Sequence, residues 1–204
     1  MLNVCFENFG KEVNSIHPIV SVSFATQEGD FLNGYLIVDT GSSSNILFNR
    51  VQDLGIVEIV EDSSRMTIVS SGTDNMESSI FKAEFTLGGI KYQEPFFMIS
   101  SDIEEVVNEK YGNNNILGII GSKFLIKHGL VLDFNSNSLY SSDSSKEEID
   151  ESENMFVVLR FNNELFVPII YLSSQDNRTM FPCLLDTGAE ENITTKFVLN
   201  KLAY

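Results

Sequence analysis

Residues 36–46 read LIVDTGSSSNI, and residues 184–194 read LLDTGAEENIT. In each stretch a short apolar run, typical of a buried strand, leads into an aspartate that is followed by threonine and glycine. A carboxylate at the end of a buried strand is costly unless it is hydrogen-bonded or neutralised. The glycine lets the backbone turn and bring its N–H groups close to the carboxylate, and the threonine hydroxyl can point inward to hold the loop.

The sequences on either side of the two Asp-Thr-Gly triplets are also similar. HPIVSVSF at residues 17–24 precedes the first triplet, VPIIYL at residues 167–172 precedes the second, and Asn-Ile follows each aspartate at the same distance. The two aspartates, Asp39 and Asp186, are 147 residues apart. This self-similarity predicts one structural unit used twice.

The second copy is shorter than the first. We expect a complete unit over residues 1–140 and the N-terminal part of a second, incomplete unit over residues 155–204. Residues 141–154 read SSDSSKEEIDESEN, an acidic, serine-rich composition that is typical of a solvated linker. We therefore expect the chain to be either a fragment of a longer protein or a natural truncation.

The pattern of the first unit predicts mostly strands. Residues 19–24 and 80–87 alternate between apolar and polar side chains, and Gly88-Gly89 predicts a tight hairpin to a partner strand over residues 90–99. Residues 122–128 have helical spacing. Short strands separated by frequent turns favour an all-β fold, a closed barrel or a sandwich, with one short helix near the end of the unit.

Charge and composition exclude several classes of function. The chain carries 13 Lys+Arg against 29 Asp+Glu, for a net charge of −16, which argues against binding to nucleic acid or to an anionic membrane. Cys5 and Cys183 provide neither a disulfide framework nor metal-ligand spacing, and we expect no metal and no cofactor. The N-terminal residues lack the pattern of a signal peptide, so we expect a cytoplasmic location.

Two aspartates in repeated units point to a particular chemistry. If the units meet across a pseudo-twofold axis, the two carboxyl groups come into contact, cannot both ionise and share one proton. One then acts as a base toward water and the other as an acid toward a carbonyl oxygen. The alternative is that Asp39 and Asp186 are ordinary turn or cap residues.

With these residues in place, the chain resembles the retropepsin-like aspartic proteases. A second stretch carries the resemblance further: residues 114–134 read NNILGIIGSKFLIKHGLVLDF, with the apolar-apolar-Gly element, short helix and strand of that family. Residues 68–73, IVSSGT, lie where the family has a glycine-tipped flap over the substrate. The resemblance implies a retropepsin-like closed β-barrel, a partial second copy of it, and an aspartic endopeptidase that acts on a peptide or protein substrate without a covalent intermediate.

The resemblance also implies roles for individual residues. It assigns Asp39 and Asp186 as catalytic groups; Thr40, Gly41, Ser42, Thr187, Gly188 and Ala189 as support for the two loops; Ser71, Gly72 and Thr73 as the flap; and Leu117 and Gly118 as packing against the catalytic loop.

Two assemblies could supply the aspartate pair. Asp39 could pair with Asp186 of the same chain, or with Asp39 of a second chain in a homodimer whose second triplet is a spectator. The incomplete second unit also leaves a different class of function open, a catalytically inactive module of the same fold that binds peptides or dimerises. The sequence does not indicate the substrate or the cleavage specificity.

Overall fold

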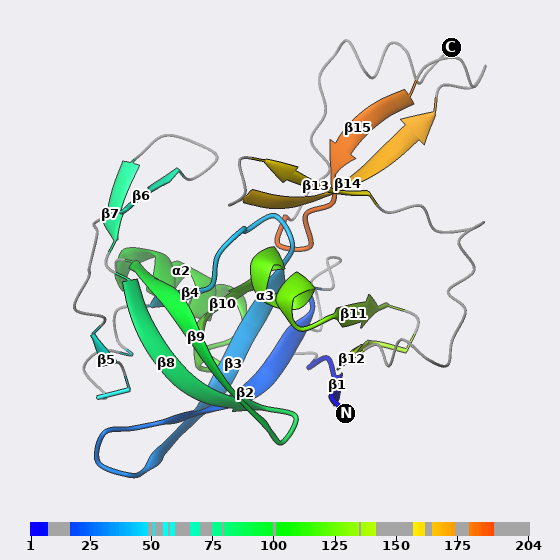
Figure 1. The fold of residues 1–204 in the computed structure, drawn as a ribbon. Coiled ribbons are helices and arrows are strands. Elements are labelled where there is room, and N and C mark those ends of the chain that lie inside the picture. The colour runs from blue at the N-terminus through cyan, green and yellow to red at the C-terminus, as the bar shows by residue number, and fades with distance from the viewer. Residues whose placement is uncertain are drawn as a thin grey trace.

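The computed structural model describes residues 1–7, 17–48, 51, 55–56, 58–59, 66–69, 75–78, 80–99, 101–134, 136–141, 157–161, 165–173 and 180–189. The elements of the first unit are β1 (Asn3–Cys5), β2 (Ile19–Ala25), β3 (Phe31–Asp39), β4 (Ile46–Phe48), β5 (Glu58–Ile59), β6 (Met66–Val69), β7 (Asn75–Ser78), β8 (Ile80–Leu87), β9 (Ile90–Ile99), α2 (Ser101–Lys110), β10 (Ile116–Gly121), α3 (Ser122–Lys127), β11 (Leu130–Asp133) and β12 (Ser138–Ser141). They are followed by β13 (Val157–Phe161), β14 (Leu165–Ser173) and β15 (Met180–Leu184) (Figure 1).

Six strands of the first unit form a closed barrel. Their order is β2–β3–β10–β4–β9–β8, and β8 pairs with β2 to close the ring. β10 runs parallel to β3 and β4 runs parallel to β9, whereas the other pairs in the ring are antiparallel. Closure leaves the six strands without an open edge, which stabilises an all-β unit of this size. The predicted all-β closed barrel is confirmed.

Alternation along the strands builds the core. In β8, Phe81, Ala83, Phe85 and Leu87 are buried while the residues between them are more exposed. The ring of Phe85 lies 5.4 Å from that of Phe24 and 5.6 Å from that of Phe96, centroid to centroid, so aromatic side chains from three strands meet inside the barrel. Their burial supplies the main driving force for closing it.

The hairpin between β8 and β9 forms where the glycine pair predicts it. Gly88 and Gly89 have φ of +56° and +79°, a left-handed backbone that glycine adopts without the steric cost of a Cβ. Two consecutive residues of this kind match the right-handed twist of the flanking strands.

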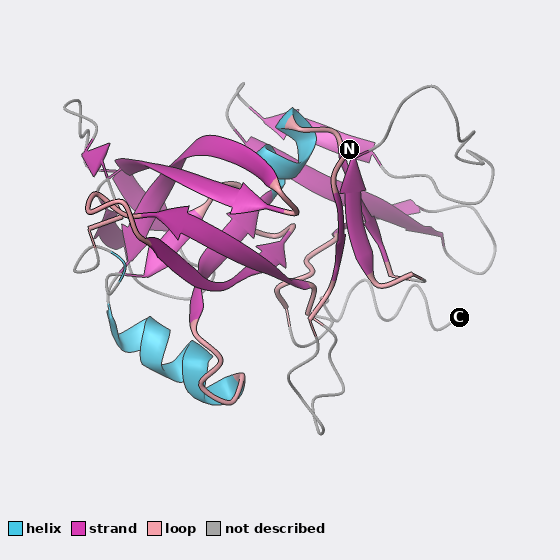
Figure 2. Ribbon diagram, turned by 90° about the horizontal axis from the view of Figure 1, so that it is seen from below, coloured by secondary structure: helices cyan, strands magenta, loops and turns pink. Residues whose placement is uncertain are grey.

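The two helices with described bounds, α2 and α3, each follow a strand of the barrel directly. α3 occupies the predicted position, and its side chains Phe124 and Leu125 are buried against the core. The longer helix, α2, was not predicted, and it lies outside the barrel (Figure 2). Its sequence, SDIEEVVNEK, is strongly acidic and has few apolar residues, so the periodicity is weak.

Three further sheets are described beside the barrel, and the smallest is the antiparallel pair of β6 and β7. β1, β12 and β11 form a three-stranded antiparallel sheet, and β13, β14 and β15 form another (Figure 1). The predicted linker lies, apart from Ser141, outside the described residues, so the domain boundaries stay predictions. Within the described part of the chain, no helix is long and apolar enough to cross a membrane.

Candidate active site

The first triplet begins at the end of β3. The side chains of Leu36 and Val38 are fully buried in the barrel, and β10 runs parallel beside this strand so that Gly121 is in register with Asp39. The apolar strand therefore carries the carboxyl group to the rim of the barrel, as the quoted sequence predicts.

Backbone N–H groups of the following turn hold the Asp39 carboxyl group. The N–H of Gly41 donates to Oδ1 at 2.8 Å, and the N–H of Ser42 donates to the same oxygen at 3.2 Å. The Ser42 carbonyl in turn accepts from the backbone N–H of Ser122 at 2.8 Å and from the Ser122 hydroxyl at 3.0 Å. The first residue of α3 thus anchors the loop to the barrel.

Asn45 closes the same loop. It is buried, its Nδ2 donates to the carbonyl of Pro95 at 3.2 Å, and its Oδ1 accepts from the N–H of Gly121 at 3.1 Å. One side chain therefore ties the end of the loop to both β9 and β10. The repeated Asn-Ile after each triplet was the available sequence signal for this role, but sequence reasoning did not include Asn45 in the site.

The second triplet follows β15 and has the same local geometry. The N–H of Gly188 donates to Oδ1 of Asp186 at 2.9 Å, as the N–H of Gly41 does for Asp39. Ala189, at the end of the described loop, is exposed. Figure 1 shows this loop beside the loop that follows β3.

Four reciprocal hydrogen bonds join the two triplets. The N–H of Thr40 donates to Oγ1 of Thr187 at 3.0 Å, and the N–H of Thr187 donates to Oγ1 of Thr40 at 3.0 Å. The Thr40 hydroxyl donates to the carbonyl of Leu185 at 2.5 Å, and the Thr187 hydroxyl donates to the carbonyl of Val38 at 2.7 Å. Each threonine therefore accepts one bond and donates two, in a matching arrangement on both sides.

The two glycines let the carboxyl groups approach. A Cβ added to Gly41 would collide with the carboxyl group of Asp186, and a Cβ added to Gly188 would collide with that of Asp39. Each carboxyl group thus lies directly over the glycine of the other triplet. Any side chain at either position would push the aspartates apart.

The surroundings of Asp39 favour its protonated form. Burial raises the pKa of the Asp39 carboxyl from its ordinary 3.8 to about 6, and the charge of Asp186 and a hydrogen bond with its side chain act in the same direction. The N–H groups of Gly41 and Ser42 oppose the change because they stabilise the ionised carboxylate. Two carboxyl groups this close titrate as a pair, so the shared proton belongs to both.

The structure places the predicted packing residues slightly differently. Leu117 is fully buried in the barrel and packs against Gly34, and Gly118 lies against the backbone of Ile46 in β4. It is Gly121 that lies against the loop, because its Cα faces the backbone of Ser44. β10 continues past Gly118 to the level of Asp39. The glycine of β10 that contacts the Asp39 loop is therefore Gly121, three residues after the predicted Gly118. Ser71, Gly72 and Thr73 of the predicted flap lie outside the described residues.

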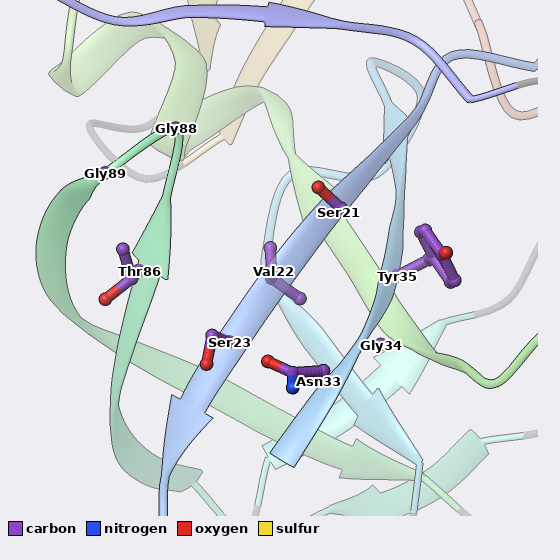
Figure 3. A pocket seen from close by; sticks show the side chains of 9 residues that line it. All are labelled: Ser21, Val22, Ser23, Asn33, Gly34, Tyr35, Thr86, Gly88 and Gly89. Carbon is purple, nitrogen blue, oxygen red and sulfur yellow. The ribbon is translucent and has the colours of Figure 1, made fainter. Parts of the chain in front are cut away.

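An open pocket of about 490 Å³ lies away from the two triplets. It is lined by Ser21, Val22, Ser23, Asn33, Gly34, Tyr35, Thr86, Gly88 and Gly89 (Figure 3). These residues come from β2, β3 and the β8–β9 hairpin, and no predicted site residue is among them. Across the described ranges, no three His, Cys, Asp or Glu side chains are grouped so that they could hold a metal ion.

Comparison with known proteins gives structural neighbours but no sequence relatives. No protein-family model and no curated protein matches the chain. The retroviral protease-like domain of Ddi1 from Leishmania major is similar at 19% identity with a TM-score of 0.39, over 61% of this chain and 89% of that one. A retropepsin-like aspartic protease from Rickettsia conorii is similar at 13% identity with a TM-score of 0.40, over 68% of this chain and 86% of that one. Both are retropepsin-like, the family that the motifs resemble, but similarity this low assigns no activity.

Proposed function

We propose that this chain is an aspartic endopeptidase in which Asp39 and Asp186 of one molecule activate a water for attack on a peptide bond. The observation that carries the proposal is the reciprocal hydrogen bonding of Thr40 and Thr187, which keeps the two carboxyl groups together. An aspartate that only caps a helix or closes a turn is not expected to contact the carboxyl group of a second aspartate. Contact between two carboxyl groups is costly, and it is expected where they share a proton for catalysis.

The proposed reaction needs one proton on the pair. The ionised carboxylate takes a proton from the water, the water oxygen bonds to the peptide carbonyl carbon, and the protonated carboxyl group donates its proton to the carbonyl oxygen. The tetrahedral intermediate then breaks its C–N bond: the leaving nitrogen takes up the proton that the water gave to the first carboxylate, and one hydroxyl of the intermediate returns its proton to the second carboxylate, which restores the singly protonated pair. The raised pKa of Asp39 supports a pair that holds one proton, which belongs to both carboxyl groups.

The backbone donors of the loops keep the pair in its reactive geometry. The N–H groups of Gly41 and Ser42 fix one oxygen of Asp39, so its other oxygen is left to face the partner carboxyl and the water. These donors belong to a loop that Ser122 holds to the barrel. Little reorganisation is then needed during the reaction, which is the main source of such catalysis.

Pairing within one chain is favoured over pairing between two chains. The carboxyl group of Asp186 lies against Gly41, and that of Asp39 lies against Gly188. A second copy of the chain would have to displace the whole Asp186 loop, and its four hydrogen bonds with the first loop, before its own Asp39 could reach this position.

A peptide-binding module without catalysis is the second candidate. It is favoured by the three-stranded sheet of β13, β14 and β15, in which the described pairings leave one side of β13 and one side of β15 unpaired. An extended peptide can add to such an edge through main-chain hydrogen bonds. Binding of this kind would not depend on the charge of Asp39.

Cleavage of an unfolded protein substrate between about pH 4 and pH 7 tests the proposal. Wild-type protein should produce new peptide termini, whereas Asp39→Asn should not, although its Oδ1 can still accept from Gly41 and Ser42. Asp30→Asn is the matched control, because Asp30 is an exposed aspartate in the turn between β2 and β3. Substrate bound but left uncut by the wild type would favour the binding module.

A further inference from the structure

His17 touches the second triplet from the opposite end of the chain. It precedes Pro18 at the start of β2, its side chain is buried, with 5% exposed, and its Nδ1 lies 3.1 Å from the carbonyl oxygen of Thr187. A carbonyl oxygen can only accept, so Nδ1 carries the hydrogen in this contact. The bond bridges 170 residues and ends next to Asp186.

Residues of the first unit hold the imidazole ring of His17 in place. It meets the ring of Tyr111 edge-on, with centroids 5.9 Å apart and planes at 88°, and Tyr111 is itself buried. The adjacent Pro18 carbonyl accepts from the N–H of Val38 at 2.8 Å, and the Val38 carbonyl accepts from the Thr187 hydroxyl. His17 and Val38 therefore hold Thr187 at its two oxygens from neighbouring strands.

Among the described residues, the two aspartate loops have different hydrogen-bond partners. The Asp39 loop is anchored within its own barrel, through Ser122 and Asn45. For the Asp186 loop, the described hydrogen bonds from outside its own triplet come from the first unit, through the Thr40 and Val38 contacts and through His17.

The sequence repeat shows the same asymmetry. HPIV at residues 17–20 corresponds to VPII at residues 167–170, so Val167 stands where the first unit has His17. A valine side chain has no hydrogen-bond donor. Val167 therefore cannot donate a side-chain hydrogen bond of the kind that His17 makes.

We propose that His17 is a positioning residue that braces the Asp186 loop from the first unit. By holding the Thr187 carbonyl, it keeps Asp186 over Gly41 and opposite Asp39. This role rests on the proposed function for its effect on catalysis, but the bracing itself can be measured without any substrate.

Two substitutions separate the hydrogen bond from the packing. His17→Phe keeps an aromatic ring against Tyr111 and removes the donor. His17→Asn restores an N–H group near the position of Nδ1 with a smaller side chain. If the bond to Thr187 matters, the asparagine variant should resemble wild type more closely than the phenylalanine variant does.

Amide hydrogen exchange gives the first readout. In His17→Phe the N–H groups of Thr187 and Gly188, which donate to Thr40 and Asp186, should exchange about fivefold faster, the effect of losing one hydrogen bond. His17→Asn should bring the rate back toward wild type. The N–H of Phe85 in the barrel core should exchange as before in both variants, which shows that the fold is intact.

Kinetics give the second readout. His17→Phe should lower kcat about fivefold with little change in KM, because the misplaced group is Asp186 and not the substrate site. Unchanged exchange at Thr187 and Gly188 would overturn the bracing role. Faster exchange with unchanged kcat would overturn its importance for catalysis. A wild-type protein that cleaves nothing but shows the predicted exchange would refute the protease proposal and support the bracing by His17.

Discussion

Replacing Asp39 by asparagine should change how the stability of the protein depends on pH. The substitution keeps the size of the side chain and an Oδ1 that accepts from Gly41 and Ser42, and it removes the titrating group. Its effect therefore reports the free-energy cost of ionising a carboxyl group in contact with Asp186.

The size of the effect follows from the pKa of Asp39. Burial, with the charge and hydrogen bond of Asp186, raises this pKa from 3.8 to about 6. A carboxyl group with a raised pKa binds its proton more tightly in the folded protein. Its contribution to stability is therefore fully present below pH 3.8 and is lost as the pH rises through 6. A pKa difference of this size corresponds to about 3 kcal/mol.

Urea unfolding at pH 3.5 and pH 7.5 measures this contribution. When the pH rises from 3.5 to 7.5, the free energy of unfolding of the wild type should fall by about 3 kcal/mol relative to that of Asp39→Asn. Ionisable groups outside the Asp39–Asp186 pair contribute to both proteins and cancel in the comparison. Asp30→Asn, at an exposed position, should follow the wild type.

Identical pH dependence in the wild type and Asp39→Asn would refute the reasoning. It would mean that Asp39 ionises in the folded protein as easily as in the unfolded chain. The carboxyl group would then be neither desolvated nor in contact with a second carboxyl group.

Three further substitutions test the support around the site. Thr40→Val leaves the Thr187 N–H and the Leu185 carbonyl without their partner, so it should lower the free energy of unfolding by about 2 kcal/mol and abolish most cleavage. Thr40→Ser keeps the hydroxyl and should retain the stability and the cleavage of the wild type. Urea unfolding measures the first effect, and release of peptides measures the second. Gly188→Ala puts a methyl group into the carboxyl of Asp39, so cleavage should be lost; normal turnover would contradict the described contact. Asn108→Leu removes three buried hydrogen bonds, two with Ile116 of β10 and one with the carbonyl of Glu104 within α2, and should lower the thermal midpoint, at a cost of about 3 kcal/mol; an unchanged midpoint would show that the bonds contribute nothing.

Local patterns were sufficient to predict the barrel strands and the β8–β9 hairpin. Alternation in residues 80–87 places Phe81 and Phe85 inside, and the two glycines supply the left-handed turn that joins the strands. Such features depend on residues close in the sequence, so they can be read from it directly.

Other features depend on tertiary context. α2 is held by Asn108, which bonds to both the N–H and the carbonyl of Ile116, and an asparagine in an acidic stretch gives no sign of this. The contact of Gly121 with Ser44 depends on the register of β10 against β3 and β4, which the apolar-apolar-Gly pattern does not specify.

The candidate site also combines features that the local sequence predicts with features that depend on tertiary contacts. The identity of each triplet and its own Asp–Gly turn are local, and the repeat suggested that the two would meet. The bond from His17 to Thr187 joins residues 170 positions apart, and its sequence neighbours, a proline and an apolar strand, are those of an ordinary core histidine. Only the folded arrangement shows which carbonyl it reaches.

The most direct test of the central claim is the proteolytic activity of Asp186→Asn. It is measured on an unfolded protein at the optimum pH of the wild type, beside wild type and Asp39→Asn. If Asp39 and Asp186 form one catalytic pair within the chain, both variants lose cleavage, and mixing them does not restore it. Cleavage retained by Asp186→Asn and lost only in Asp39→Asn would contradict this account, because the second triplet would then be a spectator.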